Sequence, residues 1–200
     1  MARRSKPLVT QFFNRDRLAF TAMNKVGHVS SDHLRSCGLA DRRIQNLIRD
    51  GLIEKVAYKR KGKSDYCFKL SKLGRESAAR LWALGCAYHA QSPIHDLAIA
   101  EKYFSLSEES RESWKTETLI RKEFEDRISE LRREGNEVEA KLYQDMLKEK
   151  LISMPDGLYI NSAGNEVGVE IITNSYGIEE MRSKETFVSM LGCHYEPIRV

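Results

Sequence analysis

The first part of the chain places apolar residues in stripes of helical spacing, and polar turns separate these stripes. Residues 12–25 carry the first stripe, an imperfect one, with apolar side chains at positions 13, 18, 20 and 23. The second stretch is short: Ser30 or Ser31 is its candidate N-cap, and Gly38 ends it. The pattern therefore predicts two helices before residue 40.

A third helix is predicted by "LADRRIQNLIRDG", in which Ile44, Leu47 and Ile48 recur at the i, i+3, i+4 spacing of one helix face. The other face carries side chains suited to base edges and phosphates in a major groove: Arg42, Arg43, Gln45, Asn46 and Arg49. This order of elements is that of a helix-turn-helix. The alternative is that these arginines form only a solvated helix face.

Two strands joined by a basic turn are predicted next, in "GLIEKVAYKRKGKSDYCFKLS", where Tyr66, Phe68 and Leu70 alternate with polar or small residues. The turn contains Gly62 and carries four cations that are expected to grip the DNA backbone: Lys59, Arg60, Lys61 and Lys63. With the three helices, and with "RDGLIEK" and "LSKLGRE", residues 12–85 resemble the winged helix of bacterial regulators.

The second part of the chain is predicted to hold helices, then a small sheet with a helix between strands. One helix begins near Pro93, and residues 108–128 are expected to form the next. From residue 125 to residue 150, 14 of 26 side chains are charged, which indicates either a solvated helical hairpin or a helix extension, inserted in the domain. Strands are expected over residues 154–160, 166–172 and 195–200, with a helix over 178–191.

Charge divides the chain more sharply than the net value of +4 suggests. Residues 1–90 hold 19 Lys and Arg against 7 Asp and Glu, whereas residues 91–200 hold 14 against 22. A basic half suits a polyanion such as double-stranded DNA, and an acidic half is expected to be a separate domain. We expect a basic tail over residues 1–11, a DNA-binding domain over 12–88 and a second domain over 89–200.

Composition excludes several classes of protein. No apolar run reaches the roughly 18 to 20 residues of a membrane span, and the N-terminus lacks the apolar core of a secretory signal. A cytoplasmic protein with no membrane partner is therefore expected. His28 and His33 are interpreted as surface or capping residues, and the Cys193 and His194 pair as structural. The cysteines occur singly and are expected to be buried, reduced thiols: Cys37, Cys67, Cys86 and Cys193.

"PDGLYINSAGNEVGVEI" resembles a known catalytic motif. Its Pro-Asp opens a strand, Glu170 follows 14 positions after Asp156 in an apolar strand, and Glu117 lies on an earlier helix. These features resemble the PD-(D/E)XK nuclease fold. Together with the winged helix, "IHDLAIAEKYF" and "SWKTETLIRKEF", the order is similar to the replication-relaxation family of plasmids and mobile elements. The resemblance implies an α+β protein in which an N-terminal winged helix-turn-helix precedes a small α/β nuclease-like domain.

The resemblance also implies a catalytic site. Asp156 and Glu170 would hold Mg²⁺ or Mn²⁺, and Glu117 would be a third carboxylate. Ile172 stands where the motif has its lysine, and Lys184 on the following helix is the candidate for a displaced amine. The alternatives are that Asp156 is a turn or cap residue and Glu170 an edge-strand carboxylate, or that the domain serves only as a scaffold or for dimerisation.

These observations lead to two functional expectations. The first is a sequence-specific DNA-binding protein of a plasmid or mobile element that acts in replication, transfer or transcriptional control, with a nuclease-like domain whose site is either altered or silent. The second is a magnesium-dependent DNA nickase or endonuclease. A homodimer would suit a palindromic site, and a replication or transfer protein is a further expected partner of the acidic half.

Overall fold

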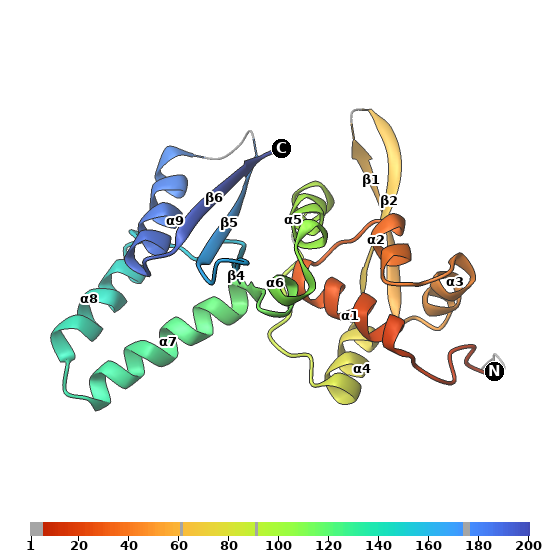
Figure 1. Cartoon of the computed structure of the whole chain (residues 1–200), viewed down its shortest axis with the longest axis horizontal. Helices are drawn as coiled ribbons and strands as arrows, with labels where there is room; N and C mark the ends of the chain where they lie inside the picture. Colours follow the sequence, from red (N-terminus) through yellow and green to blue (C-terminus); the bar gives the residue numbers. More distant parts are fainter. Residues whose placement is uncertain (1–5, 61, 91, 174–176) are drawn as a thin grey trace. The chain divides into compact units, whose positions relative to one another are not determined.

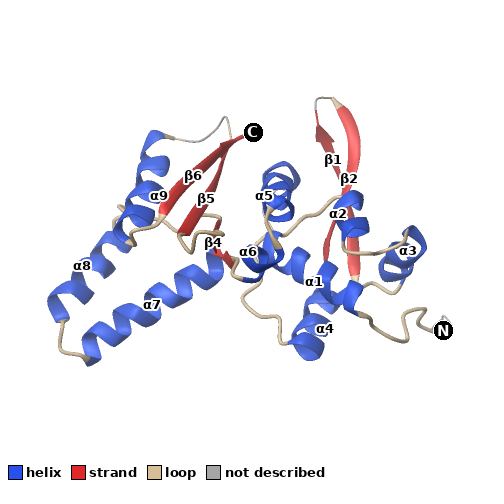
Figure 2. Ribbon diagram, viewed as in Figure 1, coloured by secondary structure: helices blue, strands red, loops and turns tan. Residues whose placement is uncertain are grey.

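The computed structural model describes residues 6–60, 62–90, 92–173 and 177–200. Contacts divide the chain into two compact units, Met1–Phe104 and Ser105–Val200 (Figures 1 and 2). The described residues form nine helices and two sheets, so the expected α+β class is confirmed. None of the described helices is both long enough and apolar enough to cross a membrane.

The first unit contains three helices, an antiparallel hairpin and two further helices, so the predicted order of elements is confirmed. The N-cap of the second helix is Ser30, whose hydroxyl accepts a hydrogen bond from the backbone N–H of His33. The bounds are α1 Asn14–Val26, α2 Ser31–Ser36, α3 Asp41–Arg49, β1 Ile53–Arg60, β2 Lys63–Leu70, α4 Lys72–Trp82 and α5 Pro93–Ser105.

The β1–β2 hairpin runs from Ile53 opposite Leu70 at its base to Arg60 opposite Lys63 at its tip. Phe68, Leu70 and also Cys67 are buried, whereas Tyr66 is 50% exposed. The outer half of the hairpin, which carries Tyr66, extends beyond the helices (Figure 1). The hairpin is therefore anchored at its base and solvated towards its tip.

The core of the first unit is formed by one apolar side chain from each of its first elements. Phe20 of α1, Leu34 of α2 and Leu47 of α3 have no exposed surface. Phe20 also meets Phe12 and Trp82 edge to face, with ring centroids 6.1 and 5.3 Å away. These ring contacts pack Phe12 and α4 against α1.

Helix α5 belongs to the first unit, so the units divide after Phe104, later than the boundary between residues 88 and 89 that charge suggested. His28 Nδ1 lies 2.7 Å from Asp96 Oδ2, and the ring of His33 stacks on Phe104 with centroids 4.5 Å apart. Charge patterns cannot reveal such packing. His33 caps α2 as expected, but His28 is 3% exposed, so its interpretation as a surface residue is wrong.

The second unit is a four-stranded sheet with helices. The strand order is β3-β4-β5-β6, in which β5 and β6 are parallel and the other pairs antiparallel. Helix α9 connects the parallel pair. The bounds are α6 Glu108–Glu112, β3 Lys115–Thr116, α7 Glu117–Arg133, α8 Glu137–Lys148, β4 Gly157–Ile160, β5 Glu166–Ile172, α9 Ile178–Met190 and β6 His194–Arg199.

One predicted helix of the second unit is wrong, and one predicted hairpin is confirmed. Residues 108–128 do not form a single helix, because Lys115 and Thr116 pair with β4 and the Thr116 hydroxyl then caps α7 by accepting the N–H of Leu119. The charged stretch over residues 125–150 does form a helical hairpin, which comprises the end of α7 and α8.

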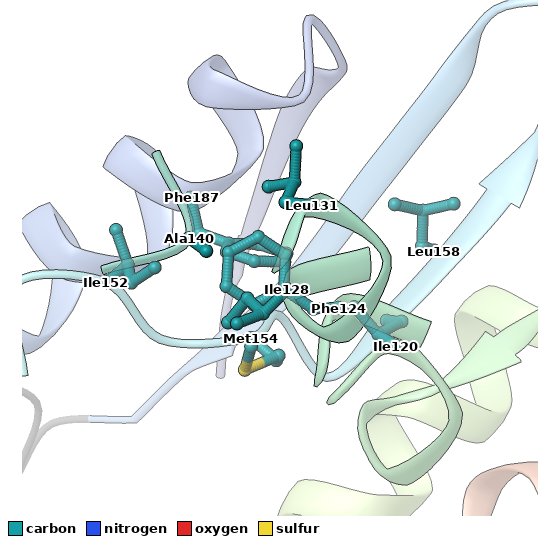
Figure 3. Close-up of a cluster of buried hydrophobic side chains, with 9 residues drawn as sticks. All are labelled: Ile120, Phe124, Ile128, Leu131, Ala140, Ile152, Met154, Leu158 and Phe187. Atoms are coloured by element: carbon teal, nitrogen blue, oxygen red, sulfur yellow. The ribbon is translucent and has the colours of Figure 1, made fainter. Parts of the chain in front are cut away.

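Helices α7, α8 and α9 meet the sheet in a shared apolar core, shown in Figure 3. Phe124 and Phe187 lie edge to face with centroids 5.2 Å apart, and both pack with Leu158 of β4. Helix α9 approaches β5 very closely at Gly168, where an added Cβ would lie 2.7 Å from a methyl group of Val188. This glycine allows α9 to lie directly on the sheet.

Replacing Gly27 with Ala is expected to destabilise the first unit by about 2–4 kcal/mol. Gly27 has a φ of 79°, and its new Cβ would lie 2.6 Å from Asp96 Oδ2, so backbone strain and overpacking add together. Gly51→Ala is the matched control, since Gly51 has a φ of 71° with open space around it, and only the strain of about 1 kcal/mol applies. Urea denaturation measures both. Equal losses would contradict the close approach at Gly27.

Candidate DNA interface and buried carboxylate site

Helix α3 presents a polar face to solvent, as the sequence predicted. Its apolar side is held in the core by Ile44 and Leu47, which are at most 3% exposed. Arg42, Gln45 and Arg49 are exposed on the other side, whereas Asn46 is half-buried. Side chains of these types on an exposed helix can contact phosphates and base edges.

Arg43 differs from the other arginines of α3 because it is bound inside the unit. Its Nε and Nη2 lie 2.8 Å from the two carboxylate oxygens of Asp16, and Nη2 also donates to the carbonyl of Gln11 at 2.8 Å. Asp16 is fully buried, and the Arg43 side chain is 14% exposed. Arg43 therefore attaches α3 to α1, and this contact was not foreseen from the sequence.

The tip of the β1–β2 hairpin carries exposed cations at the predicted positions. Lys59, Arg60 and Lys63 are exposed, and Arg60 and Lys63 face each other across the hairpin. Lys61 lies outside the described residues. The three described cations concentrate positive charge at a solvated end of the unit.

One further basic group on the same hairpin, Lys55, was not indicated by the sequence pattern. Lys55 Nζ lies 3.8 Å from the ring centroid of Tyr66, and both residues are exposed. These two residues border a cavity of about 340 Å³ together with Gln45 of α3. The contact between Lys55 and Tyr66 could be predicted only from the hairpin register, which places Lys55 diagonally across from Tyr66.

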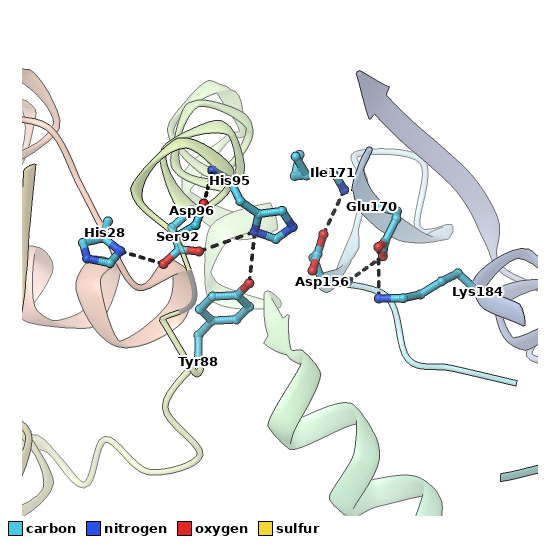
Figure 4. A network of polar contacts seen from close by, with 9 residues as sticks. All are labelled: His28, Tyr88, Ser92, His95, Asp96, Asp156, Glu170, Ile171 and Lys184. Carbon is cyan, nitrogen blue, oxygen red and sulfur yellow. Dashed lines mark hydrogen bonds and ion pairs between the residues drawn. The ribbon is translucent and has the colours of Figure 1, made fainter. Parts of the chain in front are cut away.

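The second unit brings Asp156 and Glu170 together on adjacent strands. Asp156 directly precedes β4, and the pairing of Gly157 with Val169 places Asp156 opposite Glu170. Each carboxylate accepts a hydrogen bond from a backbone N–H of the other strand (Figure 4). The N–H of Asp156 donates to Glu170 Oε2 at 3.1 Å, and the N–H of Ile171 donates to Asp156 Oδ2 at 2.8 Å. The two carboxylates thus connect β4 and β5.

Lys184 reaches this pair from α9. Its Nζ lies 3.0 Å from Glu170 Oε1, and the two side chains are 8% and 0% exposed. Ile172, which stands at the motif position of the lysine, is two residues beyond Glu170 on the same face of β5. The ammonium group therefore approaches Glu170 from the helix that covers this face, and one positive charge partly compensates two negative ones.

Glu117 does not join this pair in a metal-binding cluster. It is the first residue of α7, and its side chain lies 3.4 Å from the guanidinium of Arg121. Among the described residues, no group of three or more His, Cys, Asp or Glu side chains is arranged to hold a metal ion. The two carboxylates match a hard divalent cation in ligand type, but Glu170 Oε1 already contacts Lys184, which such an ion would have to displace or share.

Tyr195 of β6 is a further polar group near the carboxylates. It pairs with Gly168 of β5, and its hydroxyl is buried without a hydrogen-bond partner among the described residues. Burial, followed by the charges of Glu170, Glu185 and Asp156, raises the pKa of Tyr195 to about 12. The hydroxyl therefore remains a neutral donor beside the site. The sequence gives no signal for it, because the register of β6 is needed.

None of the four cysteines is in a disulfide within the described part of the chain: Cys67 is buried and the other three are half-buried. Burial raises the pKa of Cys67 to about 11 and that of Cys193 also to about 11. Cys193 Sγ contacts Glu166 Oε2 at 3.4 Å. Both thiols stay protonated at neutral pH, where they are poor nucleophiles and poor metal ligands.

Comparisons with known proteins give no relative of this chain: no family model, no curated protein and no solved structure matches it.

Replacing Arg43 with Met is expected to destabilise the first unit by about 3–5 kcal/mol, because the buried carboxylate of Asp16 loses its cation. The adjacent exposed Arg42→Met is the matched control and should change stability by less than about 0.5 kcal/mol. The double variant Asp16→Asn, Arg43→Met should recover part of the loss. Chemical denaturation measures all three. Similar small effects of both single variants would show that the Asp16 pair does not attach α3.

Proposed function

We propose that this protein binds double-stranded DNA through α3 and the β1–β2 hairpin. The observation that carries the proposal is the exposed polar face of α3, with Arg42, Gln45 and Arg49, in a unit whose hairpin ends in exposed cations. An α-helix with its side chains is about 10–12 Å in diameter and fits a major groove about 12 Å wide.

The side chains divide into two roles under this proposal. Gln45 suits bidentate contact with adenine, and an arginine suits guanine, so α3 would supply sequence selectivity. Lys59, Arg60 and Lys63 would bind phosphates, which gives affinity and orientation without reading bases. Arg43 supports the interface indirectly, because it fixes α3 on α1.

The biological setting is part of the same proposal. A role in replication, transfer or transcriptional control of a plasmid or mobile element rests on the resemblance to the replication-relaxation family, and so do the winged-helix and nuclease-like descriptions of the two units. A homodimer on a palindromic site and a replication or transfer protein as a partner of the second unit are further proposals of this kind.

The variants Arg42→Ala and Gln45→Ala are expected to weaken DNA binding while leaving the fold intact. The preferred duplex is first selected from a random pool, and fluorescence anisotropy is then measured over a salt series. Arg42→Ala should reduce the salt slope by about one, and Gln45→Ala should reduce discrimination between bases by about 1–3 kcal/mol. Arg80→Ala, an exposed change on α4, is the control. If the α3 variants bind as well as this control, α3 is not the interface.

A second candidate function is metal-dependent DNA nicking, which is supported by the approach of Asp156, Glu170 and Lys184. A bound Mg²⁺ or Mn²⁺ would polarise the phosphodiester and lower the pKa of an attacking water. Asp156 and Glu170 would hold the ion, and the Lys184 ammonium would stabilise negative charge on the phosphate. The hydrogen bonds between β4 and β5 keep both carboxylates in fixed positions.

Nicking is tested by incubating supercoiled plasmid with the protein and Mg²⁺ or Mn²⁺. The expected result is conversion to the open circle, with a loss of at least about 100-fold in Asp156→Asn. Glu179→Gln, which removes an exposed carboxylate from α9, is the matched control and should nick normally. No nicking with either metal, or equal nicking by Asp156→Asn, would remove this candidate and leave the DNA-binding proposal unaffected.

A further inference from the structure

A cleft of about 360 Å³ lies in the first unit, away from α3. Its walls come from the end of α1, the base of the hairpin, the first turns of α4 and residues 87–90. Three of its lining side chains are basic: Lys69, Arg75 and His89. None of the described residues that line it is acidic. The cleft therefore has the electrostatic character of an anion site.

The two permanent cations are held in place and retain donors for a ligand. Lys69 Nζ lies 3.6 Å from Glu54 Oε2 on the neighbouring strand. Arg75 Nη1 donates to the carbonyl of Leu70 at 3.0 Å. A guanidinium carries five N–H donors, and the bond to Leu70 uses one of them. Arginine fixed in this way suits bidentate contact with a phosphate.

The remaining walls are built mainly by buried residues and mix polar with apolar surface. Asn24 and Tyr88 are each 6% exposed, and the N–H of Tyr88 donates to the carbonyl of Asn24 at 2.8 Å. Met23 and Leu70 add apolar surface. Residues 87–90 pack against Gly27, where an added Cβ would lie 3.1 Å from both Tyr88 and Ala90. A ligand with a planar or apolar body is therefore accommodated beside the cations.

The buried carboxylate of Asp96, behind this wall, is bonded to two histidines. Asp96 Oδ2 approaches Gly27, and His28 and His95 lie 2.7 and 3.4 Å from the carboxylate oxygens (Figure 4). Burial acts to raise the pKa of Asp96, but the hydrogen bonds from these two histidines outweigh it and hold the pKa below its usual value. The Asp96 carboxylate is thus hydrogen-bonded to the two histidines.

The cleft is separate from the proposed DNA contacts of the hairpin. Lys69 and Leu70 lie at the base of the hairpin, whereas Arg60 and Lys63 lie at its tip. Seven residue steps along a strand correspond to about 23 Å. No residue of α3 lines the cleft. A phosphate bound at the tip would therefore not reach Arg75.

We propose that this cleft binds a small organic phosphate, with its phosphate at Lys69, Arg75 and His89 and its body against Tyr88 and Met23. A dianion matches a set of three basic groups better than a single carboxylate does. The volume lies within the roughly 300–1,000 Å³ of small-molecule sites and exceeds what inorganic phosphate alone would fill. This inference does not depend on the proposed DNA-binding function.

The test uses the full chain and three probes at constant ionic strength: phenyl phosphate, inorganic phosphate and benzoate. Amide chemical shifts in ¹H–¹⁵N spectra should change saturably at Gly27, Lys69, Arg75 and His89. Phenyl phosphate should bind about tenfold more tightly than inorganic phosphate and benzoate. Arg75→Gln should weaken phenyl phosphate about tenfold or more, whereas Lys72→Gln, an exposed change on the same helix outside the cleft, should not.

Two further variants separate binding from folding. Arg75→Lys keeps the charge but loses the bidentate contact, so its affinity should lie between those of the unchanged protein and Arg75→Gln. Lys69→Gln removes charge without altering α4 and should weaken binding. The proposal is overturned if no saturable shifts occur at these amides, or if Lys72→Gln has the same effect as Arg75→Gln. It is also overturned if Arg75→Gln weakens duplex DNA binding and the phosphate probes do not bind, because the cleft would then contact the DNA backbone.

Discussion

A carboxylate that leaves water must meet a cation or several N–H groups, and this requirement connects distant elements throughout the chain. Asp16 attaches α1 to α3 through Arg43, and Asp96 attaches α5 to the segment after α1 through His28. Glu170 attaches β5 to α9 through Lys184. In each case the buried charge fixes the position of a helix that carries or supports a candidate site.

The two candidate sites use charge in opposite ways. The cations of α3 and of the hairpin tip are exposed, so they are available to phosphates and contribute little to stability. The carboxylates of the second unit are buried, and each accepts an N–H from the neighbouring strand. Loss of function after a change at Arg42 reports on binding, whereas loss after a change at Glu170 includes the cost of a disturbed fold.

Helical stripes and caps made much of the fold predictable from the sequence. Local structure at the stripe of Ile44 and Leu47 and at the N-cap Ser30 depends on neighbours a few residues away. Such features can therefore be recognised in the sequence. Contacts between distant residues were not predictable in this way. The partner of Arg43 lies 27 residues earlier in the chain. Strand β3 has two residues, too few for any periodicity.

The candidate carboxylate site was predicted in part, and only through a resemblance. Asp156, Glu170 and Lys184 do meet, because the strand register and the helix after β5 place them on one face of the sheet. Glu117 does not form a metal-binding cluster with them among the described residues, since α7 begins at this residue and its side chain pairs with Arg121. The position of the Tyr195 hydroxyl near the carboxylates could not be predicted from the sequence, because it depends on the parallel pairing of β6 with β5.

Gly168 has no side chain, yet it allows α9 to approach the strand that carries Glu170. Val188 meets this glycine and lies one helical turn after Lys184, so both side chains project from the same face of α9. The absence of a Cβ at residue 168 sets the separation of helix and sheet, and hence the 3.0 Å distance from Lys184 to Glu170. A methyl group added at this position would push α9 away from β5. It would thereby weaken the ion pair between Lys184 and Glu170, although neither of these two residues is changed.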